Sequence, residues 1–186
     1  MTGNKGKFEE ARIVLSKFDI EPHMVDLDVD EPQSDSIDYV SKVTALSSLD
    51  TLKTPLFVED AGLFISALRG FPGVFSAYVH STIGLDGILK LMEGFPDRSA
   101  AFRSAVGFTC PTISPKVLLF EGKVEGTIAG SPKGSGGFGF DPIFIPRDSS
   151  LTYAQMKAED KCRTSHRARA LESMGAYLSS HLELIK

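Results

Sequence analysis

The sequence predicts an α/β fold in which antiparallel strand pairing is substantial. Two observations predict it. Segments of helical and of alternating hydrophobic periodicity are interspersed along the chain, and neither internal repeats nor low-complexity linkers interrupt them. The 186 residues are enough to bury a sizeable core, so we expect a single domain over residues 1–186.

Helices are predicted where apolar residues recur every three or four positions. Ser165 is suited to be the N-cap of the last of them, and Thr152 with Gln155 forms a capping-box pattern for a further short helix. The helical segments are residues 5–18, 37–53, 88–92 and 166–182.

Strands are predicted where apolar and polar residues alternate or where a short apolar run is bounded by breakers. Residues 117–128 are expected to form a hairpin that turns near Gly122. Two glycine-rich segments, 68–78 and 131–144, are expected to be structured loops, the second entering a strand. The remaining strand segments are residues 25–29, 56–58 and 102–110.

Composition excludes several classes of function. The net charge of −4 argues against nucleic acid as the partner, and no apolar run approaches the roughly 18 residues that a membrane span needs. Cys110 and Cys162 are too few for a disulfide framework or a zinc site. We therefore expect a chain that works in the reducing cytoplasm, without membrane or nucleic-acid partners.

The segment TGNKGK, residues 2–7, places a glycine-containing turn and two lysines at the start of a helix. Free N–H groups, the helix dipole and the lysines together favour a phosphate ligand, although an ordinary polar helix start has the same appearance. A strand usually precedes such a turn, and here only Met1 does, so the first strand is expected to be missing or truncated.

Glu59 and Asp60 follow the apolar run at 56–58. Such a pair of carboxylates is typical of a site for a hard divalent cation such as Mg²⁺. For this pair the alternative is a solvated strand end, with Asp60 capping a helix that begins near Leu63. The acidic segment 26–35 offers Asp30, Glu31 and Asp35 as further carboxylates, although on its own it is more typical of a solvated acidic loop.

The loop GSGGFGFDP, residues 134–142, combines backbone freedom with two phenylalanines and Asp141. Glycine lets a backbone approach a flat ligand closely, and a phenylalanine ring can stack on a base. The loop is therefore a candidate for gripping a nucleobase, and a plain glycine-rich connection is the alternative.

The segment DKCRTSHRARAL, residues 160–171, gathers cations around a helix start. Cations there oppose the helix dipole, so the arrangement predicts an anion among them. Ser165 and His166 are adjacent but lack a nucleophile elbow, which excludes a serine hydrolase. Together the four segments are the parts needed to bind a nucleotide with its metal.

The order TGNKGK, EDAGL, ALRGFPGVFSAY, GGFGFDPIF and SHRARAL resembles the inosine triphosphate pyrophosphatase family over nearly the whole chain. The resemblance implies an elongated two-lobed fold, with a long mixed, twisted central sheet flanked by helices and a substrate cleft between the lobes. It implies Mg²⁺-dependent hydrolysis of ITP, dITP and XTP to the nucleoside monophosphate and pyrophosphate, by a cytoplasmic homodimer. A pyrophosphatase of broader range and a nucleotide-binding protein with impaired catalysis are the alternatives.

The resemblance also implies roles for individual residues. Asp60 matches the proton acceptor and metal ligand, and Glu31 matches a second metal ligand, with Mg²⁺ making the adjacent Glu59 and Asp60 tolerable. Ala61 stands where many members have serine, and Phe140 where tyrosine or tryptophan is commoner. The positions that match the substrate-binding motifs are Thr2, Gly3, Asn4, Lys5, Gly6, Lys7, Ala61, Phe138, Gly139, Phe140, Asp141, Lys161, His166 and Arg167.

Overall fold

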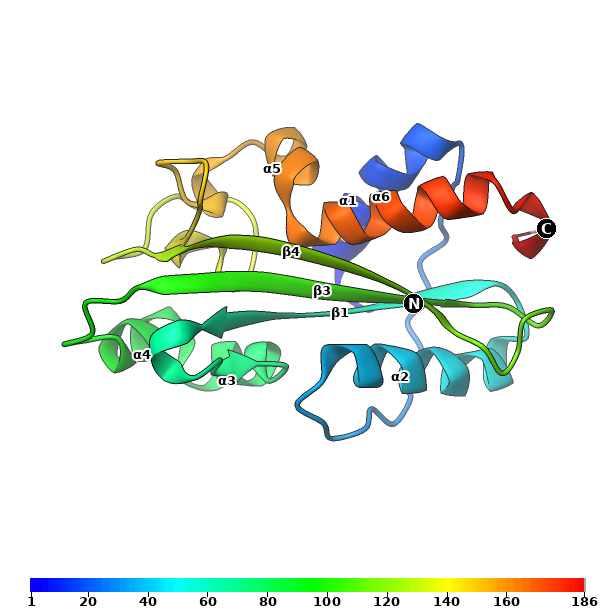
Figure 1. The fold of residues 1–186 in the computed structure, drawn as a ribbon, viewed down its shortest axis with the longest axis horizontal. Coiled ribbons are helices and arrows are strands. Elements are labelled where there is room, and N and C mark those ends of the chain that lie inside the picture. The colour runs from blue at the N-terminus through cyan, green and yellow to red at the C-terminus, as the bar shows by residue number, and fades with distance from the viewer. Residues whose placement is uncertain (186) are drawn as a thin grey trace.

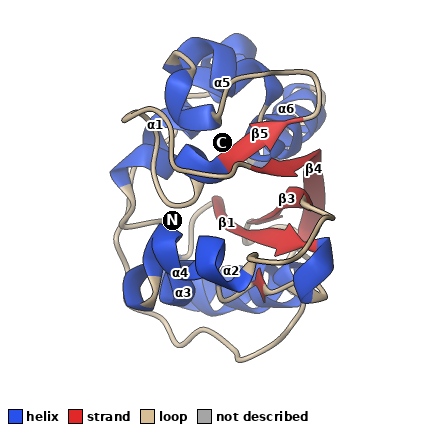
Figure 2. Cartoon of the chain, turned by 90° about the vertical axis from the view of Figure 1, so that its left-hand side faces the viewer, coloured by secondary structure: helices blue, strands red, loops and turns tan. Residues whose placement is uncertain are grey.

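The computed structural model describes residues 1–185 and confirms the α/β class, with helices on both sides of a central sheet (Figures 1 and 2). The sheet has five strands in the order β2-β1-β3-β4-β5. Their bounds are Leu56–Ile65 for β1, Pro72–Gly73 for β2, Ser99–Thr109 for β3, Leu118–Ile128 for β4 and Phe144–Pro146 for β5.

Every strand pairing within residues 1–185 is antiparallel, so the expected mixed sheet is wrong. The segment 25–29, predicted as a strand, lies outside the sheet. One backbone hydrogen bond joins it to the start of the chain, from Thr2 N–H to the Val25 carbonyl at 2.9 Å. A single bond of this kind does not build a ladder, which needs a repeating series of bonds between the two backbones.

The predicted helices are confirmed, although the last one ends before Leu182. Side chains of Asn4, Ser36 and Ser165 cap three of them, and the capping box at Thr152 and Gln155 is present. The bounds are Lys5–Leu15 for α1, Ile37–Leu52 for α2, Ser76–Thr82 for α3, Gly84–Leu91 for α4, Ala158–Thr164 for α5 and His166–Ser179 for α6.

The hairpin predicted to turn near Gly122 is wrong, because Gly122 lies inside the continuous strand β4 and pairs with Ser104 of β3. A Cβ at Gly122 would overlap with the His166 carbonyl oxygen and lie 2.8 Å from Ala170 N. The glycine therefore serves a close approach of α6 to the sheet rather than a turn.

β1 also departs from the prediction, since it continues through the two carboxylates to Ile65 instead of ending at Val58. Residues 56–65 pair with β3 throughout, so Asp60 lies within a strand and caps no helix. Side chains alternate between the faces of a strand, and Glu59 and Asp60 consequently project to opposite sides of the sheet.

The two faces of the sheet are covered by different helices. On one face α1 and α6 pack on a cluster that includes Val106 and Phe108, and Phe57 joins it. On the other face α2 packs on Leu56 and Val58. Glu59, in phase with Phe57, thus projects toward α1 and α6, and Asp60 projects toward the α2 side (Figure 1).

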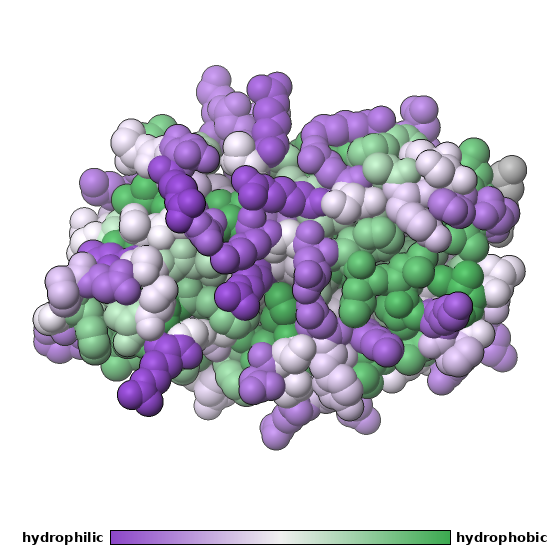
Figure 3. All heavy atoms as spheres, viewed as in Figure 1, coloured by the Kyte–Doolittle hydropathy of each residue, from purple (hydrophilic) through white to green (hydrophobic). Residues whose placement is uncertain are grey.

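A third cluster fills the end of the molecule near α3, α4 and β5, and includes Leu63, Ile88 and Phe144. In the view of Figure 1, hydrophilic side chains cross the middle of the molecule and a hydrophobic area lies between α6 and α2 (Figure 3). Cys110 and Cys162 are buried free thiols. Within residues 1–185 no helix has the length and hydropathy to cross a membrane.

Candidate active site

The first turn of α1 is built by the TGNKGK segment. The Asn4 side chain accepts a hydrogen bond from Lys7 N–H at 3.0 Å, and Asn4 N–H donates to Thr2 Oγ1 at 3.1 Å. Gly6 lies against the Phe138 ring, since a Cβ there would be 2.8 Å from Phe138 Cδ1. The helix start and the 138–141 loop, more than a hundred residues apart in sequence, are therefore in contact.

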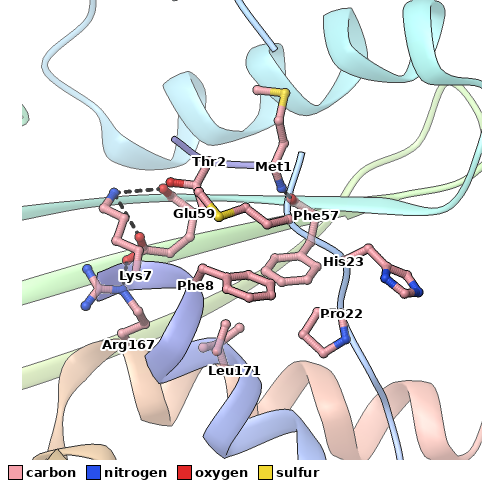
Figure 4. A pocket seen from close by; sticks show the side chains of 12 residues that line it. Met1, Thr2, Lys7, Phe8, Pro22, His23, Phe57, Glu59, Arg167 and Leu171 are labelled. Carbon is pink, nitrogen blue, oxygen red and sulfur yellow. Dashed lines mark hydrogen bonds and ion pairs between the residues drawn. The ribbon is translucent and has the colours of Figure 1, made fainter. Parts of the chain in front are cut away.

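Glu59 is held by two cations, Lys7 and Arg167 (Figure 4), and by the hydroxyl of Ser104. Lys7 Nζ lies 3.0 Å from Glu59 Oε2 and donates to the Glu59 backbone carbonyl at 3.1 Å. Arg167 Nε lies 3.1 Å from Oε1, and Ser104 Oγ donates to the same oxygen at 2.6 Å. The contacts of Lys7 Nζ with Oε2 and of Arg167 Nε with Oε1 are ion pairs without hydrogen-bond geometry.

This environment fixes the charge of Glu59. Burial opposes ionisation, but Arg167 and then Lys7 hold the pKa of Glu59 far below its ordinary value, with help from Ser104. The expectation that Mg²⁺ is what makes the adjacent Glu59 and Asp60 tolerable is therefore wrong for Glu59. Its negative charge is balanced by cations of the protein, on the face of the sheet opposite to Asp60.

Asp60 has a different environment. Burial raises the pKa of Asp60 to about 6, Lys7 opposes this, and the negative charges of Glu59 and Glu31 add to the rise. Within residues 1–185 neither Asp60 nor Glu31 forms an ion pair of its own. A carboxylate whose pKa lies this close to neutrality is suited to accept a proton.

The 138–141 loop is closed by Asp141. Its Oδ2 accepts from Lys161 Nζ at 2.6 Å and from Phe138 N–H at 2.8 Å, and Gly139 supplies the positive φ of 61° within the loop. Phe140 is 3% exposed, and its ring meets that of His80 edge-on at 5.3 Å. Phe138 is only half-buried.

Two cations lie over that ring. Lys161 Nζ is 4.6 Å and the Arg167 guanidinium carbon 5.3 Å from the Phe138 centroid, within the range of cation–π attraction. The cations around the start of α6 were predicted to surround an anion. The anions that the structure shows there are carboxylates of the protein, Glu59, Asp141 and Glu10.

His166 lies deeper than the prediction of a base contact implied. Its ring is 3% exposed and stacks on Phe102, with centroids 4.6 Å apart and planes at 8°. Burial, and after it the charge of Arg167, holds the pKa of His166 well below its ordinary value, so the ring is neutral. The ring packs into the core, and the His166 carbonyl lies against Gly122 of β4.

Sequence reasoning missed Glu10 and Ser104 as site residues. Glu10 is 9% exposed and accepts from Arg167 Nη1 at 2.5 Å, while Lys161 Nζ lies 2.8 Å from its other oxygen. A signal was present, because Glu10 lies four residues before Val14 on the buried stripe of α1. Ser104 likewise occupies an inward position among the apolar residues of β3.

The other predicted residues are placed as follows. Ala61 pairs with Ser104 in the register of β1 and β3. Gly3 lies beside Asp26, whose carboxylate a Cβ would meet at 2.8 Å. Lys5 and Glu31 are exposed side chains at the rim.

Glu31 and Asp60 are the two predicted metal ligands, and the charge of Glu31 is among those that raise the pKa of Asp60. No group of three acidic, histidine or cysteine side chains that would enclose an ion occurs within residues 1–185. Mg²⁺ commonly binds through one or two carboxylates, with substrate phosphate oxygens and water completing its six ligands. Two carboxylates without cations of their own fit that mode of binding.

Known proteins are similar to this chain in sequence and in fold. The model of the Ham1 family matches residues 1–177. A dITP/XTP pyrophosphatase of Methanopyrus kandleri is 46% identical over 181 residues, covering 97% of this chain and 95% of that protein. One from Thermococcus kodakarensis is 43% identical over 183 residues, covering 98% and 97%.

Solved structures of similar proteins have the same fold. The Ham1 protein of Staphylococcus aureus superposes with a TM-score of 0.82 at 26% identity, covering 97% of this chain and 96% of that one. A nucleoside-triphosphatase / dITP/XTP pyrophosphatase of Mycobacterium abscessus gives 0.71 at 29% identity, covering 93% and 94%. With a family model that spans nearly the whole chain and relatives this similar, the chain belongs to the Ham1 family.

Proposed function

We propose that this chain is a Mg²⁺-dependent pyrophosphatase that hydrolyses ITP, dITP and XTP to the nucleoside monophosphate and pyrophosphate. One observation carries the proposal: the start of α1 meets the 138–141 loop through Gly6 and Phe138, and it meets β1 through the ion pair of Lys7 with Glu59, next to Asp60. The names of the similar proteins, dITP/XTP pyrophosphatases, support the substrate class.

The residues take their roles from their surroundings. Asp60, with its raised pKa, accepts the proton of the attacking water. The N–H groups of the first turn of α1 and the Lys7 ammonium hold the phosphates and offset charge that develops on the leaving pyrophosphate. Glu31 and Asp60 would hold Mg²⁺, which when bound lowers the pKa of water and neutralises phosphate charge.

Base selection is assigned to the donors around Phe138. Hypoxanthine and xanthine carry a 6-oxo acceptor where adenine carries an amino donor, so donors at that edge leave adenine mispaired. The Phe138 and Asp141 N–H groups are already bonded within the loop. Gly139 N–H, Phe140 N–H and the Arg167 guanidinium are therefore the groups that we assign to this edge.

The test is pyrophosphate release from ITP, dITP and XTP, with ATP, GTP and dUTP alongside, each with and without Mg²⁺. We expect release that requires Mg²⁺ and that is at least about tenfold faster for the first three substrates. Comparable rates for all six would instead indicate a pyrophosphatase of broader range. Tight ITP binding by the folded chain without any product would indicate a binding protein.

We also propose that the enzyme works as a homodimer in the cytoplasm. Aromatic side chains of the 68–78 segment and α3 support an interface, since Phe71, Phe75 and Tyr78 are 39%, 50% and 70% exposed. Exposed apolar clusters mark contact sites on soluble proteins. Light scattering at micromolar concentration is expected to give twice the chain mass of 20.1 kDa, and the mass of one chain would contradict the dimer.

A further inference from the structure

A hollow on the sheet lies apart from the candidate active site. It opens where the end of β1 meets the first half of β3 and the second half of β4, and its volume of about 490 Å³ is typical of small-molecule sites. Among residues 1–185, its lining includes none of the residues predicted for the candidate active site. Phe64, which lines it, lies four residues beyond Asp60 on β1, about 13 Å away at roughly 3.3 Å per residue.

The lining of this hollow is strongly cationic. It contains Arg69, Arg103, Lys123 and Arg147 together with a single carboxylate, Glu125. Lys123 Nζ donates to one Glu125 oxygen at 2.9 Å, and Arg147 pairs with the other oxygen. Arg69 and Arg103 form no ion pair within residues 1–185. Two positive charges therefore lack a partner, in a protein whose net charge is −4.

Arg103 and Lys123 lie directly opposite each other in the register of β3 and β4. Like charges at such a cross-strand position repel each other and destabilise the pairing. The Arg103 guanidinium carbon is 4.7 Å from the centroid of the Phe64 ring, within the range of cation–π attraction. Glu121, on the same face of β4, is hydrogen-bonded to Asp38, which raises the pKa of Glu121. An anion between Arg103 and Lys123 would convert their repulsion into attraction.

The four cations come from separate segments, so a ligand must span the hollow to meet them together. They lie after β1, on β3, on β4 and after β5. Three of them are arginines, and the forked guanidinium group binds phosphate oxygens in pairs. A chain of several phosphates carries charges along its length, which suits this arrangement better than a single compact anion does.

We propose that this hollow is a second anion site, which binds a polyphosphate chain such as that of inorganic tripolyphosphate or of a nucleoside triphosphate. Binding there uses no metal ion and no residue of the candidate active site. The inference therefore goes beyond the proposed function and is tested without any turnover of substrate.

Calorimetric titration with tripolyphosphate, with divalent cations removed by a chelator, tests the site. Two binding events are expected in the wild type, one at the hollow and one at the start of α1, where Lys7 is assigned to phosphate. Arg69→Gly and Arg103→Gln should each raise the dissociation constant of one event at least about tenfold, because each removes a charged hydrogen bond. Lys7→Gln should weaken only the other event.

Lys53→Gly is the matched control for Arg69→Gly. Both residues are exposed cations with a positive φ, 54° at Arg69 and 52° at Lys53, but Lys53 does not line the hollow. Glycine adopts a positive φ without steric cost, so neither variant should unfold at a lower temperature than the wild type. Weaker binding in Arg69→Gly alone then cannot result from loss of folded protein.

Three results would overturn the proposal. The first is that both Arg69→Gly and Arg103→Gln bind tripolyphosphate as the wild type does. The second is that Lys53→Gly weakens the same binding event equally. The third is that Arg69→Gly or Arg103→Gln changes the mass measured by light scattering, since the cations would then belong to a contact between two chains.

Titration of the Lys7→Gln variant with ATP distinguishes the two sources of a polyphosphate chain, because the binding event at the start of α1 is weakened in this variant. An affinity equal to that for tripolyphosphate identifies the phosphate chain alone as the ligand. A tighter affinity identifies a nucleotide, and a weaker one identifies the inorganic chain. Each of these results supports the site, provided that Arg69→Gly in the same background weakens the binding.

Discussion

Asp60→Asn is expected to reduce turnover of ITP by about 10²- to 10⁴-fold while the chain stays folded. An amide cannot accept the proton of the attacking water, and it is a poorer ligand than a carboxylate for Mg²⁺. Steady-state pyrophosphate release at saturating ITP and Mg²⁺ measures the effect. Near-normal kcat in the variant would show that Asp60 is not the base.

The same substitution is expected to stabilise the chain when divalent cations are removed with a chelator. The pKa of Asp60 is raised from an ordinary value near 3.8 to about 6 in the folded protein, so ionisation disfavours folding. The contribution of Asp60 to the free energy of unfolding is fully present below about pH 4 and is lost as the pH rises to about 6. At pH 7.5 Asn should therefore raise the free energy of unfolding by about 1–3 kcal/mol.

The pH dependence makes this prediction specific. Urea unfolding at pH 7.5 and at pH 4 should show the advantage of Asp60→Asn shrinking toward zero at the lower pH. Added Mg²⁺ should stabilise the wild type more than the variant, since only the wild type retains both carboxylates. Asp148→Asn, at an exposed position, is the control and should change neither quantity. A destabilised Asp60→Asn at pH 7.5 would contradict the account.

Gly122→Ala is expected to destabilise the protein by about 2–4 kcal/mol. The added methyl would overlap with the His166 carbonyl oxygen, and neither the helix backbone nor the strand can rotate away as a side chain can. α6 must move off the sheet, which shifts Arg167 away from Glu59 and Glu10. Activity should therefore fall together with the midpoint of chemical denaturation.

Gly130→Ala is the matched control for this effect. Gly130 is exposed, and a Cβ there would meet no atom within 4 Å. Its free energy of unfolding should stay within about 0.5 kcal/mol of the wild-type value. If Gly122→Ala were equally harmless, the close contact between β4 and the start of α6 would not exist in solution.

Local pattern predicted the helices well, and the reason is physical. A helix is defined by bonds between near neighbours, and its caps are single residues such as Ser165 and Thr152. Strand predictions that depended on long-range pairing fared worse. Val25, Leu27 and Val29 alternate as a strand does, but within residues 1–185 no strand forms a ladder with them. The turn-like Glu121-Gly122-Lys123 lies inside β4, where Gly122 allows the close approach of α6 at His166, 44 residues further on.

In the candidate site, too, local motifs could be predicted from the sequence and long-range contacts could not. Asp60, Lys7, Asp141 and Arg167 were predicted because each lies in a recognisable motif. What sequence did not reveal was the pairing, since Glu59 resembled a metal ligand and is bound instead by Lys7 and Arg167. Which carboxylate is balanced by a cation and which is left free for a metal depends on side-chain direction across β1, and that follows only from the strand continuing past Val58.

The ion pairs of Glu10 with Arg167 and Lys161 also have a consequence for when the site can form during synthesis. Glu10 and Arg167 are separated by 157 positions, and Gly6 meets a loop that is also distant in sequence. The hairpin of β3 and β4 can close early because its contacts are local, whereas the candidate site requires contacts between the first and the last helices of the chain. During synthesis the ribosome thus releases α6 long after α1, and the candidate site stays incomplete until both have emerged. A complete candidate site therefore reports that the first and last parts of the chain have met.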